Sequence, residues 1–239
     1  MNLREKYGEW GIILGATEGV GKAFAEKIAS EGMSVVLVGR REEKLQELGK
    51  SISETYGVDH MVIRADFAQS DCTDKIFEAT KDLDMGFMSY VACFHTFGKL
   101  QDTPWEKHEQ MINVNVMTFL KCFYHYMGIF AKQDRGAVIN VSSLTAISSS
   151  PYNAQYGAGK SYIKKLTEAV AAECESTNVD VEVITLGTTI TPSLLSNLPG
   201  GPAGEAVMKT AMTPEACVEE AFDNLGKSLS VIAGEHNKA

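Results

Sequence analysis

The stretch that decides the fold is WGIILGATEGVGKAFAEKIAS, residues 10–30. Its opening letters form a short apolar run typical of a buried strand, and its second half has the period of a helix. Gly15, Gly19 and Gly21 lie between the two. Glycine permits a tight turn and lets backbone N–H groups approach a pyrophosphate, whose charge is favoured at a helix N-terminus. The stretch therefore predicts the opening of a dinucleotide-binding fold, with a strand-to-helix turn that binds nothing as the alternative.

The rest of the chain continues this alternation of strand and helix. Apolar runs rich in Val and Ile alternate with stretches of helical period, and such runs are typical of parallel strands covered by helices on each side. We therefore predict a single-domain, Rossmann-type α/β fold over residues 1–239, with a doubly wound parallel sheet of about seven strands and helices on both faces. The predicted strands span 10–15, 34–39, 60–66, 87–92, 136–143, 179–187 and 229–234, and the predicted helices span 20–31, 41–56, 72–81, 104–130, 152–176 and 213–226.

The composition of the 239 residues argues against several classes of protein. The net charge of −9 disfavours a surface for nucleic acid or anionic membrane, because both need clustered Lys and Arg. No uncharged apolar segment reaches the roughly 18 residues of a membrane span, and no signal-peptide pattern opens the chain. The five cysteines are odd in number and never form a CxxC pair, so neither a disulfide framework nor a metal site is indicated. We predict a cytoplasmic protein that acts on a small molecule.

The end of the second predicted strand indicates which dinucleotide binds. A carboxylate there holds the ribose 2′-hydroxyl of NAD, whereas a basic residue accommodates the 2′-phosphate of NADP. Arg40 and Arg41 follow this strand, so NADP(H) is favoured over NAD(H), with Arg40 as the principal candidate. The alternative is a pair of solvated arginines at a helix start, and Glu18 weighs against NADP if it faces the phosphate. Asp66, after the third strand, could reach the adenine or cap the next helix.

Residues 188–212, TTITPSLLSNLPGGPAGEAVMKTAM, crowd Thr, Ser, Pro and Gly after the sixth predicted strand. A stretch of this length without regular structure in a compact domain is more often a lid or binding loop than a passive connection. The sequence therefore predicts an irregular substrate lid near 188–212.

Four features, in this order, resemble the short-chain dehydrogenase/reductase family: the glycine loop, the second Asn of INVNVMTF, INVSS and YGAGK. The similarity runs over essentially the whole chain. It is nearest to the branch of hydroxysteroid dehydrogenases and very-long-chain 3-oxoacyl-CoA reductases. A tyrosine four places before a lysine also arises by chance, so the joint match carries the resemblance rather than YGAGK alone.

The resemblance implies a catalytic centre and a cofactor site. Ser143 matches the catalytic serine of the family, Tyr156 the proton donor and Lys160 the lysine that assists it. Asn115 matches the asparagine that holds a water in the proton relay, and Thr191 falls where the family contacts the nicotinamide amide. The cofactor-binding residues expected from the glycine loop, the strand ends and the resemblance are Gly15, Thr17, Gly19, Val20, Gly21, Arg40, Asp66, Phe67, Ala92, Tyr156, Lys160 and Thr191.

The end of the fourth predicted strand departs from the family pattern. The family usually reads Asn-Asn-Ala-Gly there, and this chain reads Tyr90-Val91-Ala92-Cys93. Because that motif shapes the cofactor cleft and stabilises the sheet, its replacement leaves open a catalytically quiet cofactor-binding or regulatory protein of the same fold.

The chemistry of these residue types suits carbonyl reduction. Hydride transfer to a ketone builds negative charge on the carbonyl oxygen, so proton donors are needed at that atom. Tyr156 and Ser143 can both direct hydroxyls there, and Lys160, four residues further along a helix, can lower the phenol pKa from about 10. We expect an NADPH-dependent reductase of a mainly apolar ketone, or the reverse alcohol dehydrogenase, with Tyr156 as general acid/base. The resemblance also implies a homodimer or homotetramer through helices around 111–131 and 152–176.

Overall fold

The computed structural model describes residues 2–148 and 151–238. Across these residues, seven parallel strands form one sheet in the order β3-β2-β1-β4-β5-β6-β7. The predicted doubly wound parallel sheet is therefore confirmed. The strands are β1 (Trp10–Leu14), β2 (Ser34–Gly39), β3 (His60–Arg64), β4 (Met85–Tyr90), β5 (Gly136–Ser143), β6 (Val179–Leu186) and β7 (Ser230–Ile232).

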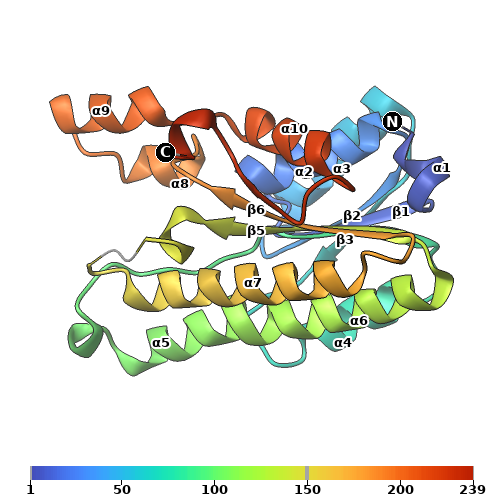
Figure 1. The fold of residues 1–239 in the computed structure, drawn as a ribbon, viewed down its shortest axis with the longest axis horizontal. Coiled ribbons are helices and arrows are strands. Elements are labelled where there is room, and N and C mark those ends of the chain that lie inside the picture. Colours follow the sequence, from blue (N-terminus) through green and yellow to red (C-terminus); the bar gives the residue numbers. More distant parts are fainter. Residues whose placement is uncertain (1, 149–150, 239) are drawn as a thin grey trace.

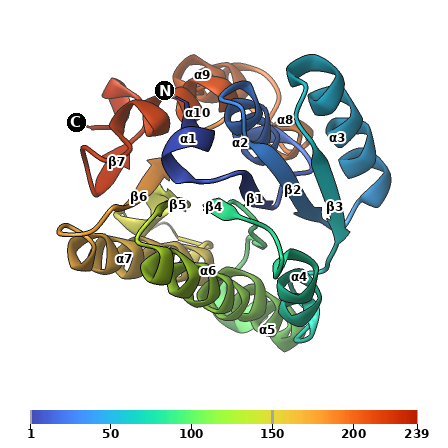
Figure 2. The ribbon, with the colours of Figure 1, turned by 90° about the vertical axis from the view of Figure 1, so that its right-hand side faces the viewer.

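Helices cover both faces of the sheet (Figure 1) (Figure 2). One layer holds α1, α2, α3 and α10 over one hydrophobic core, and the other holds α4, α5, α6 and α7 over a second core. The helices are α1 (Leu3–Tyr7), α2 (Gly19–Ser30), α3 (Glu42–Tyr56), α4 (Cys72–Thr80), α5 (Trp105–Ile112), α6 (Phe119–Gln133), α7 (Ala154–Glu173), α8 (Pro192–Ser196), α9 (Pro202–Thr210) and α10 (Pro214–Asn224), with short 3-10 turns at Leu100–Asp102, Leu144–Ala146 and Glu235–Asn237.

Strand β2 shows why the apolar runs become strands. All of its residues are buried, because β1 and β3 pair with its two edges while helices cover both faces. Its side chains alternate between the two cores, with Val35 and Leu37 in one and Val36 and Val38 in the other. A run that is apolar on both faces is the pattern that this environment requires.

The order of the strands places the site. Strands β1 and β4 are neighbours at the centre of the sheet, and the chain moves outward from them in opposite directions. In an open α/β sheet, ligands bind beyond the carboxyl ends of the strands at this switch point. The segments after Leu14 and after Tyr90 therefore border the expected binding cleft.

The helix predicted over 104–130 is interrupted, which corrects the sequence analysis. Helix α5 ends at Ile112, a π-helical segment runs over Asn113–Thr118, and α6 follows from Phe119. A π-helical turn admits an extra residue without ending the helix, so the apolar pattern continues through it. Such turns occur frequently at functional sites, and this one carries Asn115.

The segment 188–212 is not irregular as predicted, since it contains the helices α8 and α9. Each helix has a proline in its first turn, where the missing N–H costs nothing. The base of the segment is closed by parallel pairing of Thr189 with Met212, with Ile190 N–H donating to Met212 O at 2.8 Å. The segment is thus a helical excursion that leaves β6 and returns to the same point.

Helix α1 was not predicted from the sequence. Asn2 caps its first turn by accepting from Glu5 N, and Gly8 follows its last residue. Among the described residues, every helix is too short or too polar to cross a bilayer. Cys72, Cys93, Cys122, Cys174 and Cys217 are free thiols. The cytoplasmic location stays a prediction.

A buried carboxyl on β6 makes the stability of the fold depend on pH. Glu182 is fully buried, and neither side-chain oxygen has a hydrogen-bond partner among the described residues. Burial raises the pKa of Glu182 from 4.5 to about 8. The folded protein therefore holds a proton that the unfolded chain releases, so the free energy of unfolding falls as the pH rises between these two values.

We expect Glu182→Gln to remove this pH dependence. Glutamine resembles the protonated acid, so the variant should unfold like the wild type at pH 5 and be more stable by as much as about 3 kcal/mol at pH 8. Urea unfolding at both pH values measures the difference, with the exposed Glu54→Gln as control. Equal free energies of unfolding for wild type and Glu182→Gln at pH 8 would contradict the account.

Candidate active site

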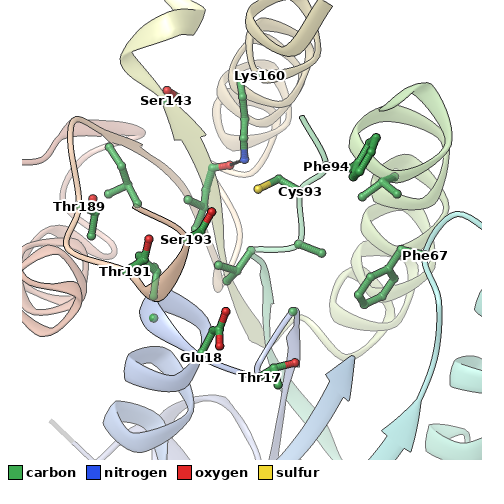
Figure 3. Close-up of a pocket in the computed structure, with 18 of the residues that line it drawn as sticks. Thr17, Glu18, Phe67, Cys93, Phe94, Ser143, Lys160, Thr189, Thr191 and Ser193 are labelled. Carbon is green, nitrogen blue, oxygen red and sulfur yellow. Dashed lines mark hydrogen bonds between the residues drawn. The ribbon is translucent and has the colours of Figure 1, made fainter. Parts of the chain in front are cut away.

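A cleft of about 360 Å³ opens beyond the carboxyl ends of β1 and β4, at the switch point (Figure 3). Most of the residues predicted from the sequence line it, although they come from seven separate segments of the chain. Gly21 and Asn115 do not line the cleft. The predicted residues along the cleft are Gly15, Thr17, Gly19, Val20, Arg40, Asp66, Phe67, Ala92, Ser143, Tyr156, Lys160 and Thr191.

The glycine loop closes tightly against the end of β4. Gly15 has a φ of +106° and Gly19 a φ of +57°, a region that favours glycine. A Cβ on Gly15 would lie 2.6 Å from the amide nitrogen of Ala92, and a Cβ on Gly21 would collide with the carbonyl oxygen of Gly15. The three glycines therefore let the loop, the start of α2 and the segment after β4 approach one another.

The N-terminus of α2 faces the cleft from this loop. Glu18 is its N-cap residue, and its side chain makes no capping hydrogen bond. Gly19 and Val20, the first residues of α2, line the cleft. Because the first N–H groups of a helix have no intrahelical partner, this end can hold an anion.

Asp66 lies at the cleft, which is one of the two positions that the sequence left open, and it does not cap α4. It lines the cleft, and its carboxylate also accepts from Ala68 N at 3.1 Å in a turn before α4. The N-cap residue of α4 itself is Asp71. Asp66 therefore caps a turn and keeps one side toward the cleft, with Phe67 next to it.

Ser143, Tyr156 and Lys160 line the part of the cleft beside β5, which β1 and β4 separate from β2 and Arg40. Ser143 ends β5, and its hydroxyl oxygen accepts from Thr145 Oγ1 at 3.0 Å. Tyr156 and Lys160 lie one turn apart on α7, with Lys160 Nζ 5.9 Å from the centre of the Tyr156 ring. Lys160 is only 2% exposed, and its ammonium donates to the carbonyl oxygen of Val141 at 2.8 Å.

The electrostatics of Tyr156 differ from the expectation. Burial raises its pKa well above the usual value, the nearby Cys93 acts in the same direction, and a hydrogen bond with Ser143 opposes them. Burial also lowers the pKa of Lys160. The ammonium of Lys160 is engaged with Val141 O, so burial outweighs its stabilisation of the Tyr156 phenolate in this structure.

Asn115 is placed behind the catalytic group instead of in the cleft. Its amide nitrogen donates to Phe94 O at 2.7 Å and its amide oxygen accepts from Phe94 N at 2.9 Å. The side chain is 1% exposed and lies against α7 near Gly159. In this arrangement Asn115 holds the segment that follows β4, at Phe94, in place relative to α7.

The unusual Tyr90-Val91-Ala92-Cys93 segment is firmly held. Tyr90 is fully buried, and its hydroxyl donates to Val114 O at 2.6 Å, which links β4 to the π-helical segment. Val91 N and Ala92 N both donate to Leu14 O, at 2.9 and 2.8 Å. The cleft therefore forms without the usual Asn-Asn-Ala-Gly, and Cys93 directs its sulfur toward Lys160 (Figure 3).

Several lining residues were not found from the sequence. Thr189 and Ser193 belong to the segment predicted as a lid, which was a usable signal. Val114 and Val141 lie within INVNVMTF and INVSS, whereas no motif marks Phe94 or Gln110. The lining residues absent from the prediction include Phe94, Gln110, Val114, Val141, Thr189 and Ser193. Across residues 2–148 and 151–238, no group of three or more His, Cys, Asp or Glu side chains is arranged to hold a metal ion.

A parallel sheet with a glycine-rich turn and a cleft at its switch point defines a dinucleotide-binding α/β protein of the Rossmann type. The sequence profile of the short chain dehydrogenases matches residues 9–198. The chain belongs to the short-chain dehydrogenase family, as the resemblance implied. It is an oxidoreductase that acts on CH–OH and C=O groups.

Known relatives extend this similarity over the whole chain. A 7β-hydroxysteroid dehydrogenase of Mediterraneibacter gnavus is 76% identical over 239 residues, which are 100% of this chain and 91% of that protein. Another 7β-hydroxysteroid dehydrogenase, from Collinsella aerofaciens, is 76% identical over 238 residues, which cover 100% of this chain and 90% of that protein. A solved structure from work on 7β-hydroxysteroid dehydrogenase stereoselectivity superposes with a TM-score of 0.97 at 76% identity, covering 100% of this chain and 92% of that one. The predicted hydroxysteroid dehydrogenase branch is confirmed.

Proposed function

We propose that this protein is an NADP(H)-dependent hydroxysteroid dehydrogenase that interconverts an oxo group and a 7β-hydroxyl group on a steroid. The observation that carries the proposal is a cleft lined by Arg40 and Arg41 after β2 and by Ser143, Tyr156 and Lys160 beside β5, with β1 and β4 between these two strands. The 7β-hydroxysteroid dehydrogenases that are 76% identical to the chain support the substrate class.

The residues present fit a bound NADP(H). The uncapped N-terminus of α2 suits the pyrophosphate, and the glycine loop leaves no Cβ in its way. Arg40 is exposed at the end of β2 and suits the 2′-phosphate. Asp66, Phe67 and Ala92 would border the adenosine half, whereas Thr191 and Lys160 would border the nicotinamide half.

The proposed chemistry divides among three side chains. When bound, NADPH supplies the hydride. Tyr156 gives its phenolic proton to the carbonyl oxygen, and Ser143 donates a second hydrogen bond that orients the same oxygen. Lys160 lies one helical turn from the phenol and stabilises the phenolate that is left, as a cation favours the ionised form of a neighbouring acid. In alcohol oxidation, Tyr156 takes up the proton instead.

We propose that residues 188–212 form the substrate lid of a single domain spanning 1–239. The segment leaves the carboxyl end of β6 and returns to it, and Thr189, Thr191 and Ser193 line the cleft. The Cγ2 of Thr191 also lies where a Cβ on Gly19 would meet it at 2.9 Å, so the lid closes on the glycine loop.

We further propose that the chain forms a homodimer or homotetramer through the layer of α5, α6 and α7. Large apolar side chains are exposed on α5, the π-helical segment and α6, notably Trp105 at 73% and Tyr124 at 80%. Exposed apolar area of this kind is typical of a protein interface. Light scattering should give a multiple of the 26.0 kDa mass of one chain, and a monomer at assay concentration would contradict this proposal.

Cofactor titration followed by a substrate panel tests the proposed function. We expect NADPH to bind more tightly than NADH, and turnover to occur with oxosteroids rather than with 3-oxoacyl thioesters or small ketones. Tight NADPH binding without turnover on any member of the panel would favour the catalytically quiet alternative. Turnover on acyl thioesters alone would contradict the substrate class.

A further inference from the structure

The two arginines after β2 have different surroundings, although both line the cleft. Arg41 Nη2 lies 2.8 Å from Glu18 Oε2, and Lys44 Nζ lies 3.6 Å from the same oxygen. Arg40 has no hydrogen bond or ion pair with any other described residue. One arginine is therefore free to receive an anion, whereas the other already holds one.

The anion that Arg41 holds belongs to the glycine loop. Glu18 is the N-cap residue of α2, makes no capping hydrogen bond and lines the same cleft beside Thr17 (Figure 3). Its side chain is 33% exposed and that of Arg41 is 46% exposed, so water reaches both groups. The carboxylate thus stands at the end of the cleft where the 2′-phosphate of NADP(H) would enter.

We propose that Glu18 is a specificity-determining residue that competes with the 2′-phosphate of NADP(H) for Arg41 and so restrains the preference for NADP(H) over NAD(H). The inference rests on the proposed NADP(H) site. A phosphate must displace the Glu18 carboxylate from Arg41, and the displaced carboxylate then repels the phosphate. Both effects weaken phosphate binding. NAD(H) presents a neutral 2′-hydroxyl, from which a carboxylate can accept a hydrogen bond. Glu18 therefore acts with opposite sign on the two cofactors.

The ion pair between Glu18 and Arg41 contributes little to the stability of the fold. Exposed pairs of this kind contribute little to stability, because water and salt screen them and two long side chains must be ordered. Helix α2 is held mainly by its buried residues, including Phe24 and Ile28, which are fully buried in one of the two cores. Removing the charge of Glu18 should therefore change cofactor affinity without unfolding the protein.

The experiment compares Glu18→Gln with Glu26→Gln on the full chain. Glu26 is a matched control, since it lies on the same helix, is 32% exposed and forms a comparable pair with Lys22 at 3.6 Å. Dissociation constants are measured for NADPH, NADH and adenosine 2′,5′-bisphosphate, which carries the 2′-phosphate without the nicotinamide. We expect Glu18→Gln to bind NADPH and the bisphosphate about three- to ten-fold more tightly, and NADH equally or less tightly. Glu26→Gln should match the wild type for all three.

A second variant guards against a folding defect at the helix start. Serine is a preferred N-cap residue, so Glu18→Ser should fold at least as well as the wild type and show the same gain for NADPH. An unchanged NADPH to NADH ratio in both variants would overturn the inference. Weaker NADPH binding in both would also overturn it, because Glu18 would then orient Arg41 for the phosphate. Failure of the wild type to bind NADPH would instead refute the proposed function itself.

Discussion

Replacing Tyr156 with phenylalanine is expected to lower kcat about 10³-fold while leaving the Kd for NADPH within about two-fold of the wild type. The substitution removes one hydroxyl and keeps the ring, which packs against His95 with ring centres 5.4 Å apart. Without the hydroxyl, the proposed donor of the proton to the carbonyl oxygen is lost, and Ser143 offers only a hydrogen bond. Turnover under saturating NADPH and a separate binding titration measure the two effects.

Tyr152→Phe provides the control for this variant. Tyr152 lies four residues earlier in the same segment, is 59% exposed and does not line the cleft of about 360 Å³. It should retain the wild-type kcat. A Tyr156→Phe enzyme with turnover like that of Tyr152→Phe would show that the proton comes from another group.

Replacing Lys160 with methionine is expected to lower kcat about 10²-fold or more. Methionine keeps the length of the side chain but removes the charge that would stabilise the Tyr156 phenolate. Lys160 is almost fully buried, so the desolvation cost that is spared opposes the loss of its hydrogen bond to Val141 O, and the change in stability should be small. Turnover and urea unfolding of the same preparation separate loss of chemistry from loss of fold.

Lys165→Met is the matched control on the same helix. The side chain of Lys165 is 79% exposed and pairs with Glu168 at 3.0 Å, away from the cleft. This variant should keep full turnover. Equal kcat values for Lys160→Met and Lys165→Met would contradict the role of the buried ammonium.

The fold could be predicted because a buried parallel strand requires an apolar run, and such a run can be recognised in the local sequence. The helix predicted over 41–56 is observed at Glu42–Tyr56, where an apolar stripe faces one core and Gly57 ends the helix with a φ of +70°. The strand predicted over 136–143 is observed with the same bounds. For these two segments, the local pattern of apolar residues was enough to predict the type of element and its bounds.

The helices of the lid could have been found from local signals. Pro192 and Pro202 stand at the first helical position, and Thr191 caps α8 by accepting from Leu194 N at 3.2 Å. The π-helical segment had no such signal. Its conformation is coupled to the two hydrogen bonds between Asn115 and the Phe94 backbone, which join segments distant in the sequence.

The residues of the cleft were predictable from motifs, but their electrostatics were not. The spacing of Tyr156 and Lys160 shows that they share a helix face, yet it cannot show that Lys160 donates to Val141 O or that burial raises the Tyr156 pKa. Similarly, the sequence places Arg41 beside Arg40 but does not show that Glu18 holds one and leaves the other free. Pairings between segments need the fold.

Transfer of deuterium from C4 of reduced, labelled NADPH to the substrate tests the central claim most directly. We expect the wild type to place the label on the carbon of the former carbonyl group of an oxosteroid, with one NADPH consumed for each hydroxysteroid formed. Tyr156→Phe should bind the labelled cofactor and transfer almost none of it. NADPH bound by the wild type with no label found in any product would contradict the account.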